Sequence, residues 1–202
     1  MCGIVGFIHH QDVLPELLNS LANVEYRGYD SAGVSLLTPE GIRTVKRQGR
    51  LAGLRAQLNL SVVSGFAGIG HTRWATHGKP DCINAHPHCN EAVAVVHNGI
   101  IENHGELRKW LESEGYTFTS QTDSEVIPHL IDLFLKQGFD PSMALNHALD
   151  RLEGAFAVGV LFKSDPKHVY AARRGSPLVL GVSSKGTALA SDALALDVDY
   201  EK

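Results

Sequence analysis

The stretch Met1-Cys2-Gly3-Ile4-Val5-Gly6 opens the chain and places a thiol one peptide bond from the initiating methionine. We expect Met1 to be removed because the next side chain is small, which leaves Cys2 with both a sulfur nucleophile and a free α-amine. An α-amine titrates at about 7.7–8.0 and a thiol near 8.5, so the amine can accept the thiol proton near neutral pH. Residues 3–8 are typical of a short buried strand. The stretch therefore predicts a thiol fixed at a strand end.

Composition limits the classes of protein that fit. The 202 residues, 44% of them apolar, can bury a full core, and we expect one domain over residues 1–202. A net charge of −4 with mixed signs argues against nucleic acid as a partner. No apolar run approaches the roughly 20 residues of a membrane helix, and the start lacks the features of a secretion signal. The odd set of cysteines, Cys2, Cys82 and Cys89, predicts free thiols in a reducing cytoplasm.

Apolar periodicity predicts the order of helices and strands. Helices are expected at residues 11–25, 51–58, 102–115, 122–135 and 141–152. Strands are expected at residues 3–8, 34–37, 42–46, 66–71, 92–96, 155–162, 169–172, 178–182 and 188–190. Strands, then a block of helices, then strands indicate a layered α+β fold with antiparallel sheets.

Three local signals add detail to this pattern. Thr122 and Glu125 have capping-box spacing and predict a helix that opens at Thr122. Pro128 falls inside that helix, so we expect a lost backbone bond or a kink in its first turns. The segment 72–90 is long and rich in Gly, Pro, His and Asn, which is typical of a functional loop.

The chemistry of a thiol nucleophile points to further residues. Attack on a carbonyl creates an oxyanion that needs hydrogen-bond donors, and Asn98-Gly99 offers a side-chain amide and an accessible backbone N–H at a strand end. If the substrate carries an amino acid head, Arg73 has the planar fork that binds a carboxylate. Asp123 could bind the ammonium group, and its structural alternative is helix capping.

Six motifs occur together and in order along nearly the whole chain. They are Cys2–Gly6 (CGIVG), Tyr26–Gly33 (YRGYDSAG), Gly70–Gly78 (GHTRWATHG), Asn84–His88 (NAHPH), His97–Asn103 (HNGIIEN) and Thr122–Val126 (TDSEV). This set resembles the glutaminase domain of the glutamine:fructose-6-phosphate amidotransferase family, within the class II glutamine amidotransferases. The resemblance implies an N-terminal nucleophile hydrolase fold, a four-layer αββα sandwich of two antiparallel sheets.

The resemblance also implies a reaction and a role for each site residue. Cys2 would attack the side-chain amide of L-glutamine to give a γ-glutamyl thioester and ammonia, with its own α-amine as base and then acid. Asn98 and Gly99 would form the oxyanion hole. The remaining implied roles are glutamine carboxylate binding by Arg73, ammonium binding by Asp123, pocket lining by Thr76 and His77, loop closure and ammonia gating by Trp74, and support of Cys2 by Arg27.

The resemblance carries expectations about partners as well. It implies no cofactor and no metal, and it implies that ammonia reaches fructose 6-phosphate only through sugar isomerase domains that residues 1–202 do not contain. We further expect the glutaminase domain to continue by a few strands beyond this chain, which would leave a sheet edge unpaired. The full-length enzyme is expected to be a cytoplasmic homo-oligomer.

Four other hypotheses remain at this stage. A zinc site could use His71, His77, His86, His88, Cys82 and Cys89, although the spacing lacks a Cys-x-x-Cys pair or a helical histidine pair. A papain-like hydrolase would pair Cys82 or Cys89 with His86 or His97, but it lacks a third orienting group and leaves Cys2 unexplained. The chain could also be the glutaminase domain of another class II amidotransferase, or a glutamine-binding regulatory domain without turnover.

Overall fold

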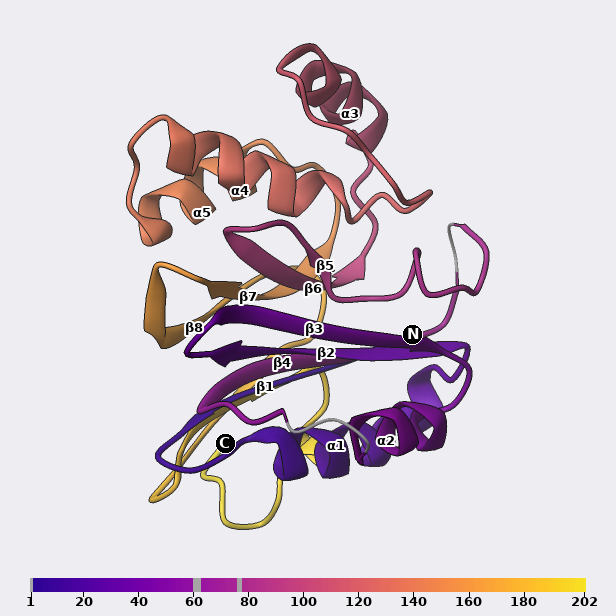
Figure 1. Ribbon diagram of the computed structural model, residues 1–202, viewed down its shortest axis with the longest axis vertical. Helices are drawn as coiled ribbons and strands as arrows, with labels where there is room; N and C mark the ends of the chain where they lie inside the picture. The colour runs from indigo at the N-terminus through magenta and orange to yellow at the C-terminus, as the bar shows by residue number, and fades with distance from the viewer. Residues whose placement is uncertain (1, 60–62, 76–77) are drawn as a thin grey trace.

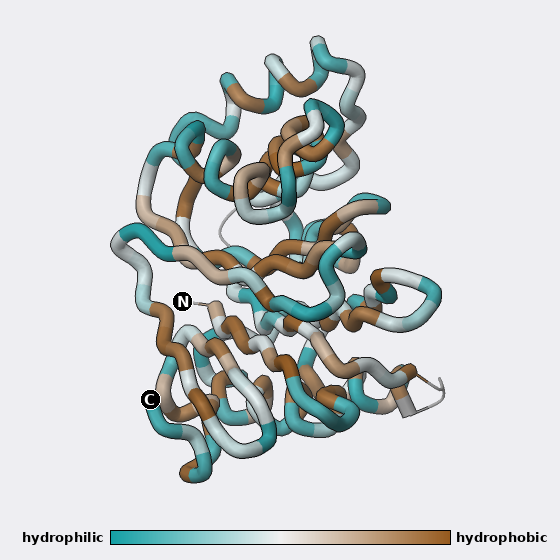
Figure 2. Tube along the Cα trace, turned by 90° about the vertical axis from the view of Figure 1, so that its left-hand side faces the viewer, coloured by the Kyte–Doolittle hydropathy of each residue, from teal (hydrophilic) through white to brown (hydrophobic). Residues whose placement is uncertain are grey.

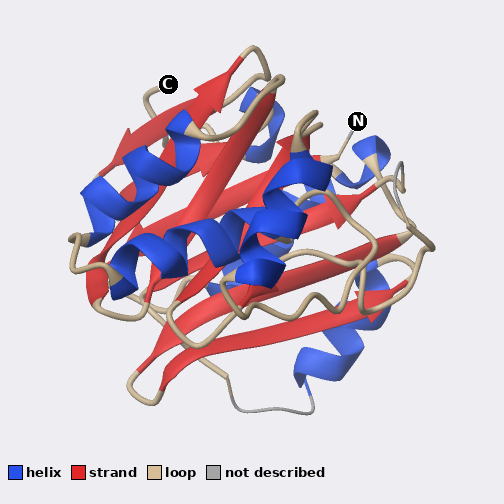
Figure 3. Ribbon diagram, turned by 90° about the horizontal axis from the view of Figure 1, so that it is seen from above, coloured by secondary structure: helices blue, strands red, loops and turns tan. Residues whose placement is uncertain are grey.

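Four layers make up the molecule in the computed structural model, which describes residues 2–59, 63–75 and 78–202. Two β-sheets lie face to face, α1 and α2 cover one outer face, and α3, α4 and α5 lie over the other (Figure 1). Viewed from above, α4 and α5 lie across the strands beneath them (Figure 3). This is the αββα sandwich implied by the sequence motifs, and the predicted α+β class is confirmed.

The first sheet contains six antiparallel strands in the order β3-β2-β4-β1-β10-β9. Its strands are β1 (Gly3–His9), β2 (Ser31–Thr38), β3 (Gly41–Gln48), β4 (Ala67–Arg73), β9 (Val179–Ser183) and β10 (Gly186–Ala190). The predicted strand after Cys2 is therefore confirmed, and it lies in the interior of the sheet between β4 and β10. This central place fixes the position of Cys2.

The second sheet contains four antiparallel strands in the order β5-β6-β7-β8. Its strands are β5 (His88–Cys89), β6 (Val93–Gly99), β7 (Phe156–Phe162) and β8 (Asp165–Arg174). Strand β6 runs beyond the predicted end at residue 96, because Asn98 and Gly99 pair with Ala157 and Phe156 of β7. The Asn-Gly pair is therefore held in the sheet rather than in a free turn.

The helices bury apolar faces against the sheets. They are α1 (Leu14–Asn23), α2 (Leu51–Asn59), α3 (His104–Ser113), α4 (Val126–Lys136) and α5 (Pro141–Asp150), with the short 3₁₀ helices η1 (Glu25–Arg27) and η2 (Ala193–Ala195). One core lies between α1, α2 and the six-stranded sheet, and a second lies between α3–α5 and the four-stranded sheet. A third core between the sheets contains Ile4, Ile69, Val96 and Leu161. Apolar residues accordingly run along the inner strands in Figure 2.

Two predictions around α4 are wrong for local reasons. Thr122 does not open a helix, because α4 begins at Val126 and the Glu125 carboxylate accepts hydrogen bonds from the backbone of Thr119 and Ser120 instead. Pro128 consequently falls in the first turn of α4, where backbone N–H groups have no partner within the helix. No internal hydrogen bond is therefore lost there, and α4 continues as one helix to Lys136.

Candidate active site

Cys2 lies at the amino-terminal end of β1, beside the end of β4. Its Sγ accepts a hydrogen bond from the Trp74 backbone N–H at 3.2 Å and lies 3.6 Å from the Trp74 carbonyl oxygen. Burial raises the pKa of the Cys2 thiol, more than the hydrogen bond from Trp74 lowers it. The thiol is therefore protonated near neutral pH and needs a base before it can attack a carbonyl.

The carbonyl oxygen of Cys2 is held from two sides. Arg27 Nε donates to it at 3.0 Å, and Asn98 Nδ2 donates at 2.9 Å. The Arg27 guanidinium is in turn held by the Asp192 carboxylate at 2.9 Å. These contacts support the predicted role of Arg27 in holding Cys2. They also add Asp192, which we did not predict because no sequence motif marks it as part of the site.

Asn98 and Gly99 lie beside Cys2 at the end of β6. Ile100 N–H donates to Ala155 O at 3.1 Å, which shows that even-numbered residues of this strand face β7. Since peptide groups alternate along a strand, the Gly99 N–H points away from β7, and Gly99 lines the same cavity as Cys2 and Asn98. Gly99 has φ of +127°, and a Cβ there would lie 2.0 Å from Ala155 O, so only glycine fits. The side-chain amide of Asn98 and the backbone of Gly99 thus line the cavity beside the thiol.

Arg73, the last residue of β4, is buried behind the nucleophile. Its guanidinium donates to the carbonyl oxygens of Lys79 at 3.1 Å and Gly78 at 3.4 Å, so it ties the following loop to the end of β4. A guanidinium has five N–H donors in a fixed fork. Arg73, which we predicted to bind the substrate carboxylate, lines the same cavity as Cys2. Thr76 and His77, which we expected beside it, lie outside the described residues.

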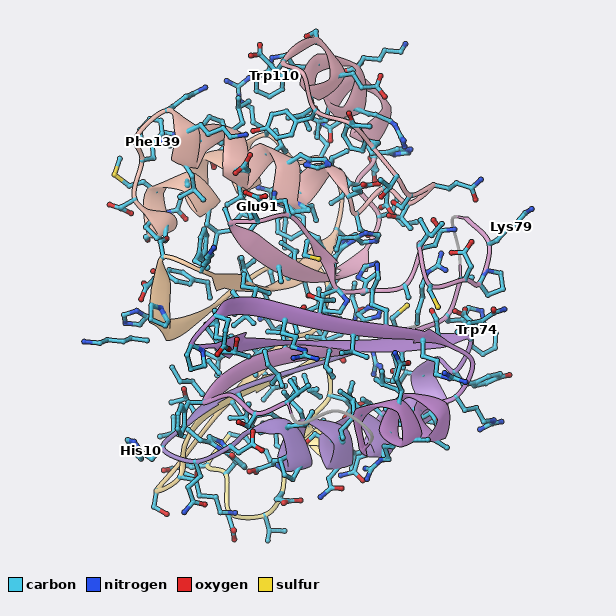
Figure 4. The ribbon with its side chains drawn as sticks, viewed as in Figure 1. His10, Trp74, Lys79, Glu91, Trp110 and Phe139 are labelled. Atoms are coloured by element: carbon cyan, nitrogen blue, oxygen red, sulfur yellow. The ribbon has the colours of Figure 1, made fainter. Side chains whose placement is uncertain are left out.

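Trp74 follows Arg73 and turns outward at the end of the sheets where the chain begins (Figure 4). Its side chain is 48% exposed and packs edge to face on Tyr29, with ring centroids 5.3 Å apart. Asp30 holds the same segment: its N–H donates to Arg73 O at 3.1 Å, and its carboxylate accepts from the Ala75 N–H. The motif at 26–33 thus shapes the loop that carries Trp74.

Asp123 lies in the segment before α4, and its side chain is buried. One carboxylate oxygen accepts from the Ile101 N–H at 2.8 Å, and the other lies 3.4 Å from the Ser124 hydroxyl. The residue does not cap α4, whose N-cap position is Glu125. The structural alternative raised from the sequence is therefore wrong, and the carboxylate lines the same cavity as Cys2.

The cavity that the described residues form beside the thiol is small. Its volume is about 30 Å³, and Cys2, His71, Arg73, Asn98, Gly99 and Asp123 are among the residues that line it. This is about the volume of one water molecule. The described residues thus leave little space beside the thiol, and the exposed Trp74 borders this cavity.

Four buried histidines cluster at the cavity: the zinc hypothesis had grouped His71, His86 and His88, and the structure adds His97. The His71 and His86 rings stack with centroids 4.2 Å apart, and His88 and His97 lie 4.7 Å and 6.3 Å from His86. Burial lowers all four pKa values, to about 3 for His71 and His88 and to about 4 for His97. All four imidazoles are therefore neutral near pH 7.

The described residues do not support the zinc-site hypothesis or the papain-like hydrolase hypothesis. Among residues 2–59, 63–75 and 78–202, no three His, Cys, Asp or Glu side chains are arranged to hold a metal ion. Cys82 and Cys89 are exposed, whereas His86 Nδ1 accepts from the His97 N–H and His97 Nδ1 bonds to Ser124 Oγ. These histidines are engaged with backbone and hydroxyl groups rather than with a thiol.

Comparisons with solved structures define the class of fold. Glutamine phosphoribosylpyrophosphate amidotransferase from B. subtilis, solved with ADP and GMP, superposes with a TM-score of 0.85 and 28% identity over 100% of this chain and 45% of that chain. A glutamine aminotransferase class-II domain protein from Silicibacter pomeroyi has the same fold, with a TM-score of 0.64 and 19% identity over 94% of this chain and 88% of that one. The fold is that of the N-terminal nucleophile amidotransferases.

Sequence comparison gives the family. The family model described as the glutamine amidotransferase domain matches residues 80–198, and the chain belongs to this family. It is 50% identical over 198 residues to glutamine–fructose-6-phosphate aminotransferase (isomerizing) of Clostridium tetani and 52% identical to the Bradyrhizobium diazoefficiens protein of that name. Both matches cover 97% of this chain and 32% of the relative. The chain thus spans about a third of these curated relatives.

Proposed function

We propose that this chain is the glutaminase domain of a glutamine–fructose-6-phosphate aminotransferase, with Cys2 as its amino-terminal nucleophile. One arrangement carries the proposal: the Cys2 thiol, the Asn98-Gly99 donors, Arg73 and Asp123 line one cavity, although they come from four separate segments of the chain. A thiol, two oxyanion donors, a cation and an anion together match the side-chain amide, carboxylate and ammonium of glutamine.

The first half of the reaction follows from these groups. Once Met1 is removed, the α-amine of Cys2 takes the thiol proton, and the sulfur attacks the side-chain carbonyl carbon of glutamine. The resulting oxyanion accepts hydrogen bonds from Asn98 Nδ2 and the Gly99 N–H. The protonated amine then gives its proton to the leaving nitrogen, so that ammonia departs and a γ-glutamyl thioester remains.

The second half returns the enzyme to its starting state. The amine takes a proton from water, and the hydroxide attacks the thioester carbonyl within the same oxyanion hole. Collapse of this intermediate releases glutamate and the Cys2 thiolate, which recovers the proton from the amine. Arg73 holds the substrate carboxylate and Asp123 its ammonium throughout, and Thr76 and His77 contribute to glutamine binding.

The use of the ammonia depends on parts of the relatives that this chain does not match. We propose that those parts bind fructose 6-phosphate, that Trp74 gates ammonia toward them, and that the product is glucosamine 6-phosphate. We also propose that residues 1–202 form one domain within a cytoplasmic homo-oligomer. No helix of the described residues is long and apolar enough to cross a membrane.

Ammonia release from L-glutamine tests this function. We expect the wild-type chain to release ammonia and glutamate in equal amounts, Cys2→Ala to release neither, and Cys89→Ala, which removes an exposed thiol of β5, to match the wild type. Activity that survives in Cys2→Ala would contradict the proposal. Saturable glutamine binding without ammonia from the wild type would instead identify a regulatory binding domain.

A further inference from the structure

The edge of β6 near Cys2 is covered by side chains rather than by a strand. Strand β5 pairs only with Ala94 and Val95, and in the described part of the chain the next backbone groups on this edge belong to His97. The His97 N–H donates to His86 Nδ1 at 3.2 Å, and the His97 carbonyl oxygen lies 3.0 Å from His71 Nε2. Two imidazoles thus supply the hydrogen bonds that a neighbouring strand would otherwise make.

The same nitrogen of His71 also reaches the side chain of Asn98. His71 Nε2 lies 3.0 Å from Asn98 Oδ1 as well as 3.0 Å from His97 O. Both partners are oxygens that can only accept, so Nε2 carries the proton of this imidazole. Burial holds the pKa of His71 near 3, which keeps the ring neutral in this tautomer at ordinary pH.

These contacts leave the Asn98 amide one stable orientation. Its oxygen accepts from His71, and one of its two N–H groups donates to Cys2 O at 2.9 Å. A rotation of the amide by half a turn would set two donors against each other at His71 and two acceptors against each other at Cys2. The second Nδ2 hydrogen therefore remains as the donor available to a developing oxyanion.

We propose that His71 is the positioning residue of the oxyanion hole, and that its Nε2–H fixes the Asn98 amide with the nitrogen toward the reacting carbonyl. This inference rests on the proposed glutaminase function and adds to it a cavity-lining residue that acts through Asn98 rather than on the glutamine itself. His71 contributes a second constraint through His97 O, which fixes the backbone immediately before Asn98.

Kinetics of His71 variants test the role. His71→Phe keeps a flat ring against His86 but removes the N–H, and we expect kcat for glutamine hydrolysis to fall about 10- to 100-fold with little change in KM. His71→Gln restores an N–H donor and should recover part of kcat. The matched control is His129→Leu, which removes a largely buried imidazole of α4 beside Phe118 and should leave kcat unchanged.

A double-mutant cycle distinguishes positioning from general damage. If His71 acts through Asn98, His71→Phe should lower kcat no further in an Asn98→Ala background. If the double variant instead lost kcat by the product of the two single-variant factors, the proposal would be wrong. Should His71→Phe fail to fold, judged by urea unfolding, His71→Leu enters the same cycle and is read in the same way.

A second measurement does not depend on activity, so it separates failure of this inference from failure of the proposed function. The side-chain amide protons of Asn98 give their own NMR signals in the substrate-free protein. We expect both signals to shift and their exchange with water to accelerate in His71→Phe but not in His129→Leu. Unchanged Asn98 signals in His71→Phe would overturn the positioning role, even if the wild type hydrolysed no glutamine.

Discussion

The side-chain amide of Asn98 donates to the carbonyl oxygen of Cys2 at 2.9 Å, and this contact joins the two sheets at the site. Cys2 precedes β1 of the six-stranded sheet, whereas Asn98 lies near the end of β6 in the four-stranded sheet. The nucleophile and the oxyanion donor thus depend on how the two sheets pack. The apolar layer between the sheets is therefore part of what sets the catalytic geometry.

Asn98→Ala removes the side-chain donor of the oxyanion hole. We expect kcat for glutamine hydrolysis to fall about 10²- to 10³-fold with little change in KM, because the donor acts mainly on the transition state. Steady-state ammonia release measures both constants. Asn146→Ala, an exposed asparagine on α5, is the control. A loss confined to KM would remove Asn98 from the oxyanion hole.

Asp123→Asn tests the ammonium site. Asparagine keeps an oxygen that can accept from the Ile101 N–H, so the fold should be preserved while the charge is lost. A hydrogen bond to a charged group is worth about 1.5–3 kcal/mol, and we therefore expect KM for glutamine to rise about 10- to 100-fold with a much smaller change in kcat. An unchanged KM would contradict the assignment.

Gly28→Ala tests whether the motif at 26–33 shapes the loop after β4. A Cβ at Gly28 would lie 2.5 Å from the Arg73 carbonyl carbon, so the Arg73–Trp74 peptide must move. We expect a loss of about 1–3 kcal/mol in the free energy of unfolding and a clear loss of kcat/KM. Gly105→Ala in α3, where a Cβ meets nothing within 4 Å, should lower neither quantity. Wild-type kinetics in Gly28→Ala would contradict this account.

The buried histidines make stability depend on pH. The pKa values of His71 and His88, about 3, and of His97, about 4, lie below the ordinary 6.5, so the unfolded chain takes up protons first as the pH falls. Their contribution is complete above pH 6.5 and decreases below it, by about 1.4 kcal/mol per histidine and pH unit until the folded pKa is reached. Urea unfolding at pH 7.5 and 5.5 measures this. Equal free energies would show that these histidines titrate normally.

Periodicity and turn chemistry sufficed to predict most of the fold. The strands predicted at 34–37 and 42–46 are β2 and β3, which pair up to Thr38 and Gly41, and the helix predicted at 141–152 is α5, where Asp140 accepts from the Met143 N–H at 2.9 Å. The start of α4 was mispredicted because Thr122 and Glu125 find other partners. Thr122 bonds to His88, which lies on β5 of the adjacent sheet, and spacing within a segment cannot reveal such a contact.

The site was predictable where a residue's own chemistry points to its role. Cys2, Asn98, Gly99 and Arg73 offer a nucleophile, two donors and a planar cation, and the structure brings them together. Residues that only position another site residue have no side-chain chemistry that points to their role. Asp192 and His71 become meaningful only when β10 and β4 place them beside Arg27 and Asn98.

The base in this account is the α-amine that Cys2 gains when Met1 is removed, and one comparison tests it most directly. Ammonia release from glutamine is measured on chain whose intact mass shows Met1 removed, beside chain that retains Met1, with Cys2→Ala as the blank. We predict activity only in the processed wild type, because the nitrogen of Cys2 is otherwise an amide without basicity. Equal activity in the Met1-retaining chain would contradict the amino-terminal nucleophile mechanism.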